Sequence, residues 1–284
     1  MNDFVFDQDA WLERIGYSGP RAATLETLRG LVYAHATAIA YESIDVLLDR
    51  PPVLDPERLQ AKMIRQRRGG YCFEQNMLFR AGLRSLGFDI ASLQARVVRG
   101  LAIDAPRPAL HMVLRVHLPE GPFLADVGFG NLAPTAPLVL FPMVEQDTPH
   151  ERMRFIMMGD ELVLQSRLGE RWEHVYRVVP QPRFDGDYEI GNWYTGTHTD
   201  SPYRANIIAA RPGGNRTRLT LFNGRFNVRH ADGRVERRQL ETDDDFRAVI
   251  RDDFGIDLSD ADLKSALDNM KSRATDGPPH PFFA

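Results

Sequence analysis

The N-terminal third of the chain has apolar residues at the spacing of amphipathic helices. Apolar positions recur every three or four residues in 9–17 and 22–39, and segment 56–66 opens with a proline, which the first helical turn tolerates. A further helix is predicted over 72–86, after Gly69 and Gly70 and before Gly87. The region 1–88 is therefore predicted to be a helical bundle.

From about Phe88 the pattern changes to short β-rich runs. These runs are separated by Pro, Gly and Asp clusters, and they read ALHMVLRVHL, PFLADVGF, MRFIMM, ELVLQS and WEHVYRVV. Their near-regular spacing predicts a small barrel or sandwich over 89–190.

The last region, 191–284, mixes strands and helices. RLTLF and RFNVRH flank an Asn223-Gly224 turn, VERRQL follows, and helices are expected to open near Thr242 and Ser259. The proline-rich end, GPPHPFFA, is predicted to be a tail. The order of helical bundle, β region and mixed region predicts an α+β fold.

Composition excludes several classes of protein. The 284 residues are 43% hydrophobic and 26% charged, which is typical of a folded soluble domain. A formal net charge of −4 argues against a dedicated binder of nucleic acid or anionic membranes. The acidic N-terminus lacks the features of a secretory signal, and no apolar run is long enough to span a membrane. We therefore predict a cytoplasmic protein that does not bind nucleic acid or membranes, and a weak homo-oligomer is left open.

The single cysteine, Cys72, lies directly after the glycine pair at a predicted helix start. Free N–H groups, the helix dipole and Arg65, Arg67 and Arg68 favour an anion there, and such settings lower the pKa of a thiol. The alternative is that Cys72 is a small buried hydrophobe, because it belongs to an apolar stripe that runs to Leu86. Local context alone favours the second interpretation, since lone cysteines are more often inert.

A reactive thiol needs a base and a third group that orients the base. His111 and His117 lie on one face of the strand ALHMVLRVHL, and Asp126 follows in the next apolar run. If residues 119–122 form a hairpin loop, Asp126 faces Arg115 and His117 is its closer neighbour. A turn nearer to residues 118 and 119, or a bulge, brings Asp126 to His111 instead. Geometry from sequence leaves this choice open.

Three motifs, RRGGYCFEQN, ALHMVL and ADVGFG, resemble the arylamine N-acetyltransferase family in their order and spacing. HATAIAYESIDVLL and EIGNWYTGTHTDSPY extend the resemblance over most of the chain. The resemblance implies a helical bundle, a β-barrel and an α/β lid around a papain-like or transglutaminase-like Cys-His-Asp core. It assigns that core to Cys72, His111 and Asp126.

The resemblance also implies an activity in xenobiotic metabolism. Acetyl would pass from acetyl-CoA, a cosubstrate, through Cys72 to an arylamine, arylhydrazine or N-hydroxyarylamine in a ping-pong reaction, with no bound cofactor or metal. Positions carried over as contacts of the acceptor or of CoA are Tyr41, Val97, Arg107, Pro108, Phe129 and Tyr194.

The chain departs from the family pattern near the predicted pocket. Tyr41 stands where many members have phenylalanine, Ala40 where proline is usual, and Ala109 and Leu110 where threonine is common. These departures leave the acceptor preference open. The competing interpretations are a thiol hydrolase or transglutaminase-type acyltransferase with the same three residues, and a non-enzymatic domain with Cys72 as core filler.

For the phosphates of CoA, the sequence has no GxxxxGK[ST] loop. The basic glycine segment RPGGNRTR, 211–218, is a candidate, but an ordinary connection before the strand RLTLF is the favoured interpretation.

Overall fold

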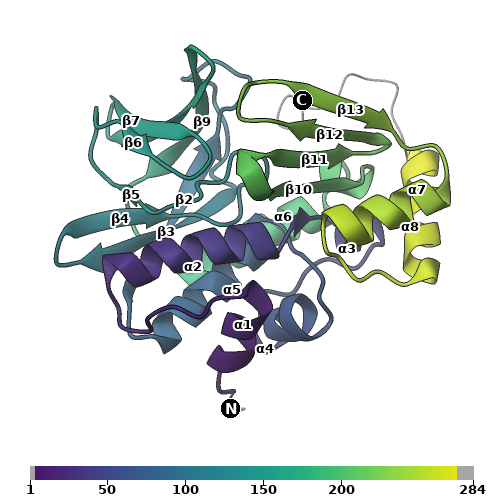
Figure 1. Cartoon of the computed structure of the whole chain (residues 1–284), viewed down its shortest axis with the longest axis horizontal. Coiled ribbons are helices and arrows are strands. Elements are labelled where there is room, and N and C mark those ends of the chain that lie inside the picture. Colours follow the sequence, from purple (N-terminus) through teal and green to yellow (C-terminus); the bar gives the residue numbers. More distant parts are fainter. Residues whose placement is uncertain (1–3, 274–284) are drawn as a thin grey trace.

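The molecule contains two antiparallel sheets, a group of N-terminal helices and three further helices in its last hundred residues. The computed structural model describes residues 4–273, and the predicted tail at 277–284 lies outside this range. In Figure 1 an eight-stranded sheet and a five-stranded sheet lie beside each other, above the N-terminal helices. This arrangement confirms the predicted α+β class.

The predicted N-terminal helices are present, and side-chain caps define where they begin. Asp7 accepts a hydrogen bond from the N–H of Ala10, and Thr24 accepts one from the N–H of Thr27, as N-cap residues do. The helix expected over 56–66 is divided, because a π-helical turn, Ala61–Arg65, continues it. The helices are α1 (Gln8–Ile15), α2 (Leu25–Ala38), α4 (Pro56–Gln60) and α5 (Cys72–Ser85).

The eight-stranded sheet is a nearly closed barrel. Its spatial order is β5-β4-β3-β2-β9-β8-β7-β6. Gln146 on one edge strand exchanges two hydrogen bonds with the backbone of Val139 on the other, and so joins the edges. The strands are β2 (Asp89–Val97), β3 (His111–Leu118), β4 (Gly121–Ala125), β5 (Leu138–Val139), β6 (Gln146–Asp147), β7 (Arg152–Met158), β8 (Glu161–Leu168) and β9 (Arg171–Val179).

The five-stranded sheet combines a strand from the N-terminal region with strands from the C-terminal region. β1 (Tyr41–Glu42) from the helical region pairs with β10 (Ile208–Pro212), followed in space by three consecutive strands. Asn223 has a φ of 52°, so the predicted Asn-Gly turn is confirmed. The remaining elements are α3 (Ile44–Leu47), β11 (Arg218–Phe222), β12 (Arg225–Arg229), β13 (Val235–Gln239), α7 (Asp243–Ala248) and α8 (Asp260–Arg273).

Segment 211–218 connects β10 to β11. Within it, the carbonyl of Gly213 accepts a hydrogen bond from His150, and Arg216 donates one to the carbonyl of the same histidine. This part of the chain therefore joins the two sheets, which agrees with the favoured interpretation of an ordinary connection.

The alternation of β3 separates two of the three hydrophobic cores. Met112, Leu114 and Val116 pack in the core shared with the helices, whereas Val113 lies in the barrel core. A third core lies between the five-stranded sheet and the last helices. The predicted two faces of this strand are therefore confirmed, and His111 points with Val113 toward the barrel.

One helix, α6 (Asp185–Thr197), is absent from the sequence prediction. It crosses the predicted domain boundary at residue 190, and Arg80 of α5 pairs with Asp185 at its start. α6 is polar and rich in glycine, and its apolar residues Ile190 and Trp193 are exposed. It therefore lacks the apolar stripe by which a helix is recognised in a sequence. The division into three domains stays a prediction.

Candidate active site

Cys72 is the first residue of α5, as the glycine pair before it predicts. Its side chain is 6% exposed, and Sγ lies 3.7 Å from the carbonyl oxygen of Leu110. The preceding residue, Tyr71, is extended, and its backbone N–H donates a 3.0 Å hydrogen bond to the Glu74 carboxylate. The sulfur thus lies where the N–H groups of a helix start lack intrahelical acceptors.

His111 and Asp126 form a buried pair. Nε2 of His111 lies 2.8 Å from Oδ2 of Asp126, and both residues are almost completely buried. This bond leaves Nδ1 as the ring nitrogen that can reach a second partner. The rings of Phe129 and Tyr176 pack against the imidazole, at centroid distances of 5.2 and 5.1 Å.

The register of the β3–β4 hairpin explains why Asp126 meets His111. Leu118 pairs with Gly121, so the loop has two residues instead of the predicted four. Leu114 pairs with Ala125, which places Asp126 diagonally across from His111. Of the two alternatives left open by the sequence, the hairpin with its loop at 119–122, which would favour His117, is therefore not formed. His117 pairs with Pro122 and is exposed.

In this pair, the attraction between the two side chains affects their pKa values more than burial does. Burial acts to lower the pKa of His111, but the Asp126 carboxylate and its hydrogen bond raise the pKa to about 10, with a further contribution from Cys72. Burial acts to raise the pKa of Asp126, whereas His111, Asn76 and the N–H of Gly128 lower that pKa below its ordinary value. The geometry therefore favours an imidazolium beside a carboxylate at neutral pH.

Asn76 and Gly128 connect this pair to α5. The Asn76 amide donates hydrogen bonds to Asp126 and to the carbonyl of Met112, at 2.9 and 2.8 Å. The Gly128 N–H donates to the same carboxylate oxygen, at 2.9 Å. A Cβ on Gly128 would lie 2.9 Å from the carbonyl oxygen of Cys72, so only glycine allows the ADVGFG turn to approach the helix this closely.

The sulfur borders a cavity of about 330 Å³. Its walls come from two segments, 97–110, which starts at the last residue of β2, and 194–203, which starts in the last turn of α6. Four of the predicted contact residues line it, namely Val97, Arg107, Pro108 and Tyr194. The structure therefore brings these four positions together with Cys72.

The other two predicted contact residues do not line this cavity. Tyr41 and Phe129 border a separate hollow of about 20 Å³ against β10 and β11. Phe129 lies against the His111 ring, and Tyr41 donates a 2.9 Å hydrogen bond from its hydroxyl to the hydroxyl of Tyr203. Both are therefore one layer behind the cavity wall.

Sequence reasoning did not single out Tyr203 or Leu110 as cavity residues, although both line it. Tyr203 is the last residue of the stretch EIGNWYTGTHTDSPY. The motif therefore included this residue but did not indicate that it lines the cavity. Leu110 precedes His111, and it contacts Cys72 Sγ through its backbone carbonyl, which a side-chain motif does not report.

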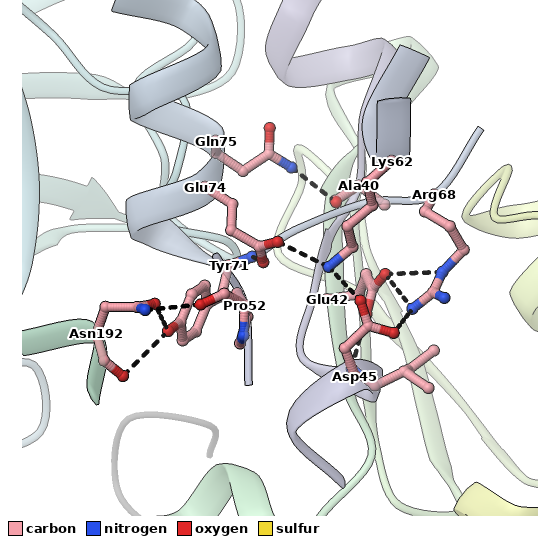
Figure 2. A network of polar contacts seen from close by, with 11 residues as sticks. Ala40, Glu42, Asp45, Pro52, Lys62, Arg68, Tyr71, Glu74, Gln75 and Asn192 are labelled. Carbon is pink, nitrogen blue, oxygen red and sulfur yellow. Dashed lines mark hydrogen bonds and ion pairs between the residues drawn. The ribbon is translucent and has the colours of Figure 1, made fainter. Parts of the chain in front are cut away.

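A buried network of charged groups supports the start of α5 (Figure 2). Lys62 bridges Glu74 and Asp45, with N–O distances of 2.8 and 2.6 Å. Arg68 bridges Asp45 and Glu42, at 2.9 and 2.8 Å. Burial raises the pKa of Glu74 to about 7, although Lys62 acts in the opposite direction. The network thus ties β1, α3 and the RRGG segment to the residue that binds the Tyr71 N–H.

Replacing Arg68 with leucine is expected to lower the free energy of unfolding by about 3–5 kcal/mol, because Glu42 and Asp45 lose their buried cation. Urea denaturation measures this loss. The matched control is Arg50→Leu, which breaks an exposed ion pair with Asp262 and should cost below about 1 kcal/mol. Equal losses in the two variants would contradict the structural role of Arg68.

None of the helices in the described range 4–273 combines the length and apolar character of a membrane span. Over the same residues, no group of three or more His, Cys, Asp or Glu side chains is arranged to hold a metal ion.

Comparisons with known proteins agree with this geometry. A family model described as N-acetyltransferase matches residues 24–263. The arylamine N-acetyltransferase of Escherichia coli K12 is 36% identical over 260 residues, which are 92% of this chain and 92% of that protein. An arylamine N-acetyltransferase / N-hydroxyarylamine O-acetyltransferase of Salmonella typhimurium is 35% identical over 237 residues, 84% of each chain.

A solved structure shows the same fold. The Mycobacterium marinum arylamine N-acetyltransferase in complex with CoA superposes with a TM-score of 0.89 at 35% identity, over 95% of this chain and 100% of that one. The predicted papain-like fold class is confirmed by this similarity.

Proposed function

Because this chain belongs to the arylamine N-acetyltransferase family of acyltransferases, we propose that it moves acetyl from acetyl-CoA to aromatic amines through an acetylated Cys72. The observation that carries the proposal is the placement of Cys72. It lies at a helix start and borders the cavity. It is also near enough to His111 for a side-chain hydrogen bond that helps to raise the pKa of the imidazole. The CoA complex of the Mycobacterium marinum relative supports acetyl-CoA as the donor.

In the first half of the reaction, the Cys72 thiolate attacks the thioester carbonyl. The bond between the acetyl carbon and the CoA sulfur breaks, and the CoA thiolate takes a proton from the His111 imidazolium. Acetyl-Cys72 and a neutral imidazole remain. N–H groups at the start of α5 are the natural donors to the oxyanion that forms during the attack.

In the second half, the amine nitrogen attacks the acetyl carbonyl on Cys72. The carbon–sulfur bond breaks, and the amine proton passes to His111, which restores the thiolate and the imidazolium. Asp126 holds the ring and stabilises its charged form, as its 2.8 Å contact allows. The name of the Salmonella relative supports N-hydroxyarylamines as further acceptors, and we extend the acceptors to arylhydrazines.

Val97, Arg107, Pro108 and Tyr194 are proposed to contact the acceptor or CoA, because they share the cavity with the sulfur. Tyr41 and Phe129 are proposed to position residues of the site without touching the substrate. Tyr41 does so through its hydrogen bond to Tyr203, and Phe129 through its contact with the His111 ring. A cytoplasmic location, suggested by the single cysteine, stays a prediction.

Acetyl-CoA without an amine is expected to leave one acetyl group on Cys72, because no acceptor is present to remove it. Intact-mass measurement after removal of free ligand, followed by peptide mapping, locates the group. Adding aniline should restore the original mass and yield acetanilide. A label on another residue contradicts the proposal, and so does release of acetate in place of transfer to the amine, which would indicate a thiol hydrolase.

A further inference from the structure

One side of the cavity is formed by residues 98–110, the wall segment, which connects β2 to β3. Arg107 and Leu110 of this segment line the cavity, and the carbonyl oxygen of Leu110 lies 3.7 Å from Cys72 Sγ. A shift of the wall segment would therefore change the space around the sulfur.

The wall segment has little hydrophobic anchoring of its own. Every residue in 99–110 is half-buried or exposed. The amides of Leu101 and Ala105 bond to carbonyls three residues earlier, inside the segment. These local bonds shape its turns but do not attach it to the barrel, so side chains that reach it from outside contribute strongly to its position.

Two arginines of the barrel bind three carbonyls of the wall segment. Arg177 of β9 donates hydrogen bonds to the carbonyls of Ile103 and Ala105, at 2.9 and 3.3 Å. Arg96 of β2 donates one to the carbonyl of Arg107, at 2.8 Å. Alternate carbonyls are thus bound by planar guanidinium groups, and these bonds attach the middle of the segment to the sheet.

Glu161, the first residue of β8, lies between the two arginines. Its Oε1 accepts a hydrogen bond from Arg96 Nε at 3.0 Å, and its Oε2 lies 2.9 Å from Arg177 Nε. Arg96 and Arg177 are direct partners across β2 and β9, a position at which two like charges repel each other. The carboxylate offsets this repulsion and fixes the direction in which both guanidinium groups point.

We propose that Glu161 is a positioning residue of the active site, because it orients the two arginines that hold the wall segment beside the sulfur. Its role in acetyl transfer rests on the proposed function, whereas its hold on the wall segment can be measured without turnover. A wall that is already in place lowers the entropic cost of binding acetyl-CoA, because the ligand does not have to order the segment.

Glu161→Ala is expected to speed hydrogen exchange in the wall segment at least about fivefold, the size of one hydrogen bond. The arginines lose their shared anion and their fixed direction, so their bonds to the wall carbonyls weaken. Mass spectrometry of peptides that cover 98–110 measures the exchange rates. Glu161→Gln keeps one acceptor oxygen for one of the two arginines and should give an intermediate rate.

Glu170→Ala is the matched control. Glu170 lies in the turn after the same strand and pairs with Arg167 at 3.1 Å, in an exposed position. The wall segment should exchange at the wild-type rate in this variant. Should Glu161→Ala fail to fold, which urea denaturation would show, Arg96→Gln provides the same test, since Arg96 is about one-third exposed and binds the Arg107 carbonyl directly.

In acetyl transfer, Glu161→Ala is expected to raise KM for acetyl-CoA about fivefold and to change kcat less than about twofold, because Cys72 and His111 are retained. The pH profile of Cys72 alkylation by iodoacetamide should match the wild type. This combination separates a displaced wall from a disturbed base, which would shift the profile.

An unchanged exchange rate in Glu161→Ala, or equal acceleration in Glu170→Ala, overturns the hold of Glu161 on the wall segment. Faster exchange with an unchanged KM, or with a shifted alkylation profile, overturns its positioning role in the reaction. If the wild-type enzyme transfers no acetyl to an amine, the proposed function fails, while the exchange rates still decide whether Glu161 holds the wall segment.

Discussion

Replacing Cys72 with alanine is expected to reduce acetyl transfer at least about a thousandfold, because it removes the single thiol of the chain and the hydroxyl groups that share the cavity are much weaker nucleophiles. The fold should persist, since the change removes one sulfur atom that borders a cavity and costs about 1 kcal/mol at most. Product formation from acetyl-CoA and aniline measures the first effect, and urea denaturation measures the second.

Cys72→Ser is the matched control, because serine keeps nearly the size of the cysteine side chain. Its hydroxyl is nearly the size of the thiol but is a weaker nucleophile in this setting, so the serine variant should also lose turnover. Turnover near the wild-type rate in the alanine variant would return Cys72 to the role of core filler. Loss of folding in alanine but not in serine would point to a packing role.

His111→Gln is expected to slow alkylation of Cys72 by iodoacetamide at pH 7 by about tenfold or more. Without the imidazolium, no ring cation is present to stabilise a thiolate, and a free thiol, with a pKa of about 8.5, is only a few per cent ionised at pH 7. The rate of alkylation as a function of pH measures the change, with folding checked by circular dichroism.

The direction of the pH effect follows from the pKa of His111. Because that pKa is raised to about 10, the ring stays protonated through neutral pH and loses its proton only near pH 10. Wild-type alkylation should therefore be nearly constant from neutral pH to about pH 9. In His111→Gln the rate should instead rise with pH over this range.

Two further variants complete this test. Asp126→Asn should resemble His111→Gln in acetyl transfer, because an amide can orient the ring but cannot stabilise its charged form. His117→Gln is the control, since His117 is exposed at the far end of β3, and its alkylation profile should match the wild type. A shifted profile in His117→Gln with a normal one in His111→Gln would contradict the assignment of the base.

Local sequence information was sufficient to predict most helices and strands and the position of one functional group, the Cys72 thiol, at a helix start. Helical periodicity, the Asn-Gly turn and the two faces of β3 are properties of neighbouring residues, and the structure confirms them. The glycine pair before Cys72 likewise marked the start of α5. Short-range backbone preferences and burial patterns determine such features, so they can be inferred without knowledge of the fold.

Only the tertiary structure decided which residues lie around the Cys72 thiol. A loop of two residues instead of four moved Asp126 to His111, and the sequence around 119–122 allows either length. α6 and Tyr203 lie near Cys72 through contacts between residues that are far apart in the chain, such as Arg80 with Asp185 and Tyr41 with Tyr203. Periodicity describes which face of an element is buried, but register and long-range pairing depend on the packing of the whole chain, and these positioned the base, the carboxylate and the cavity wall around Cys72.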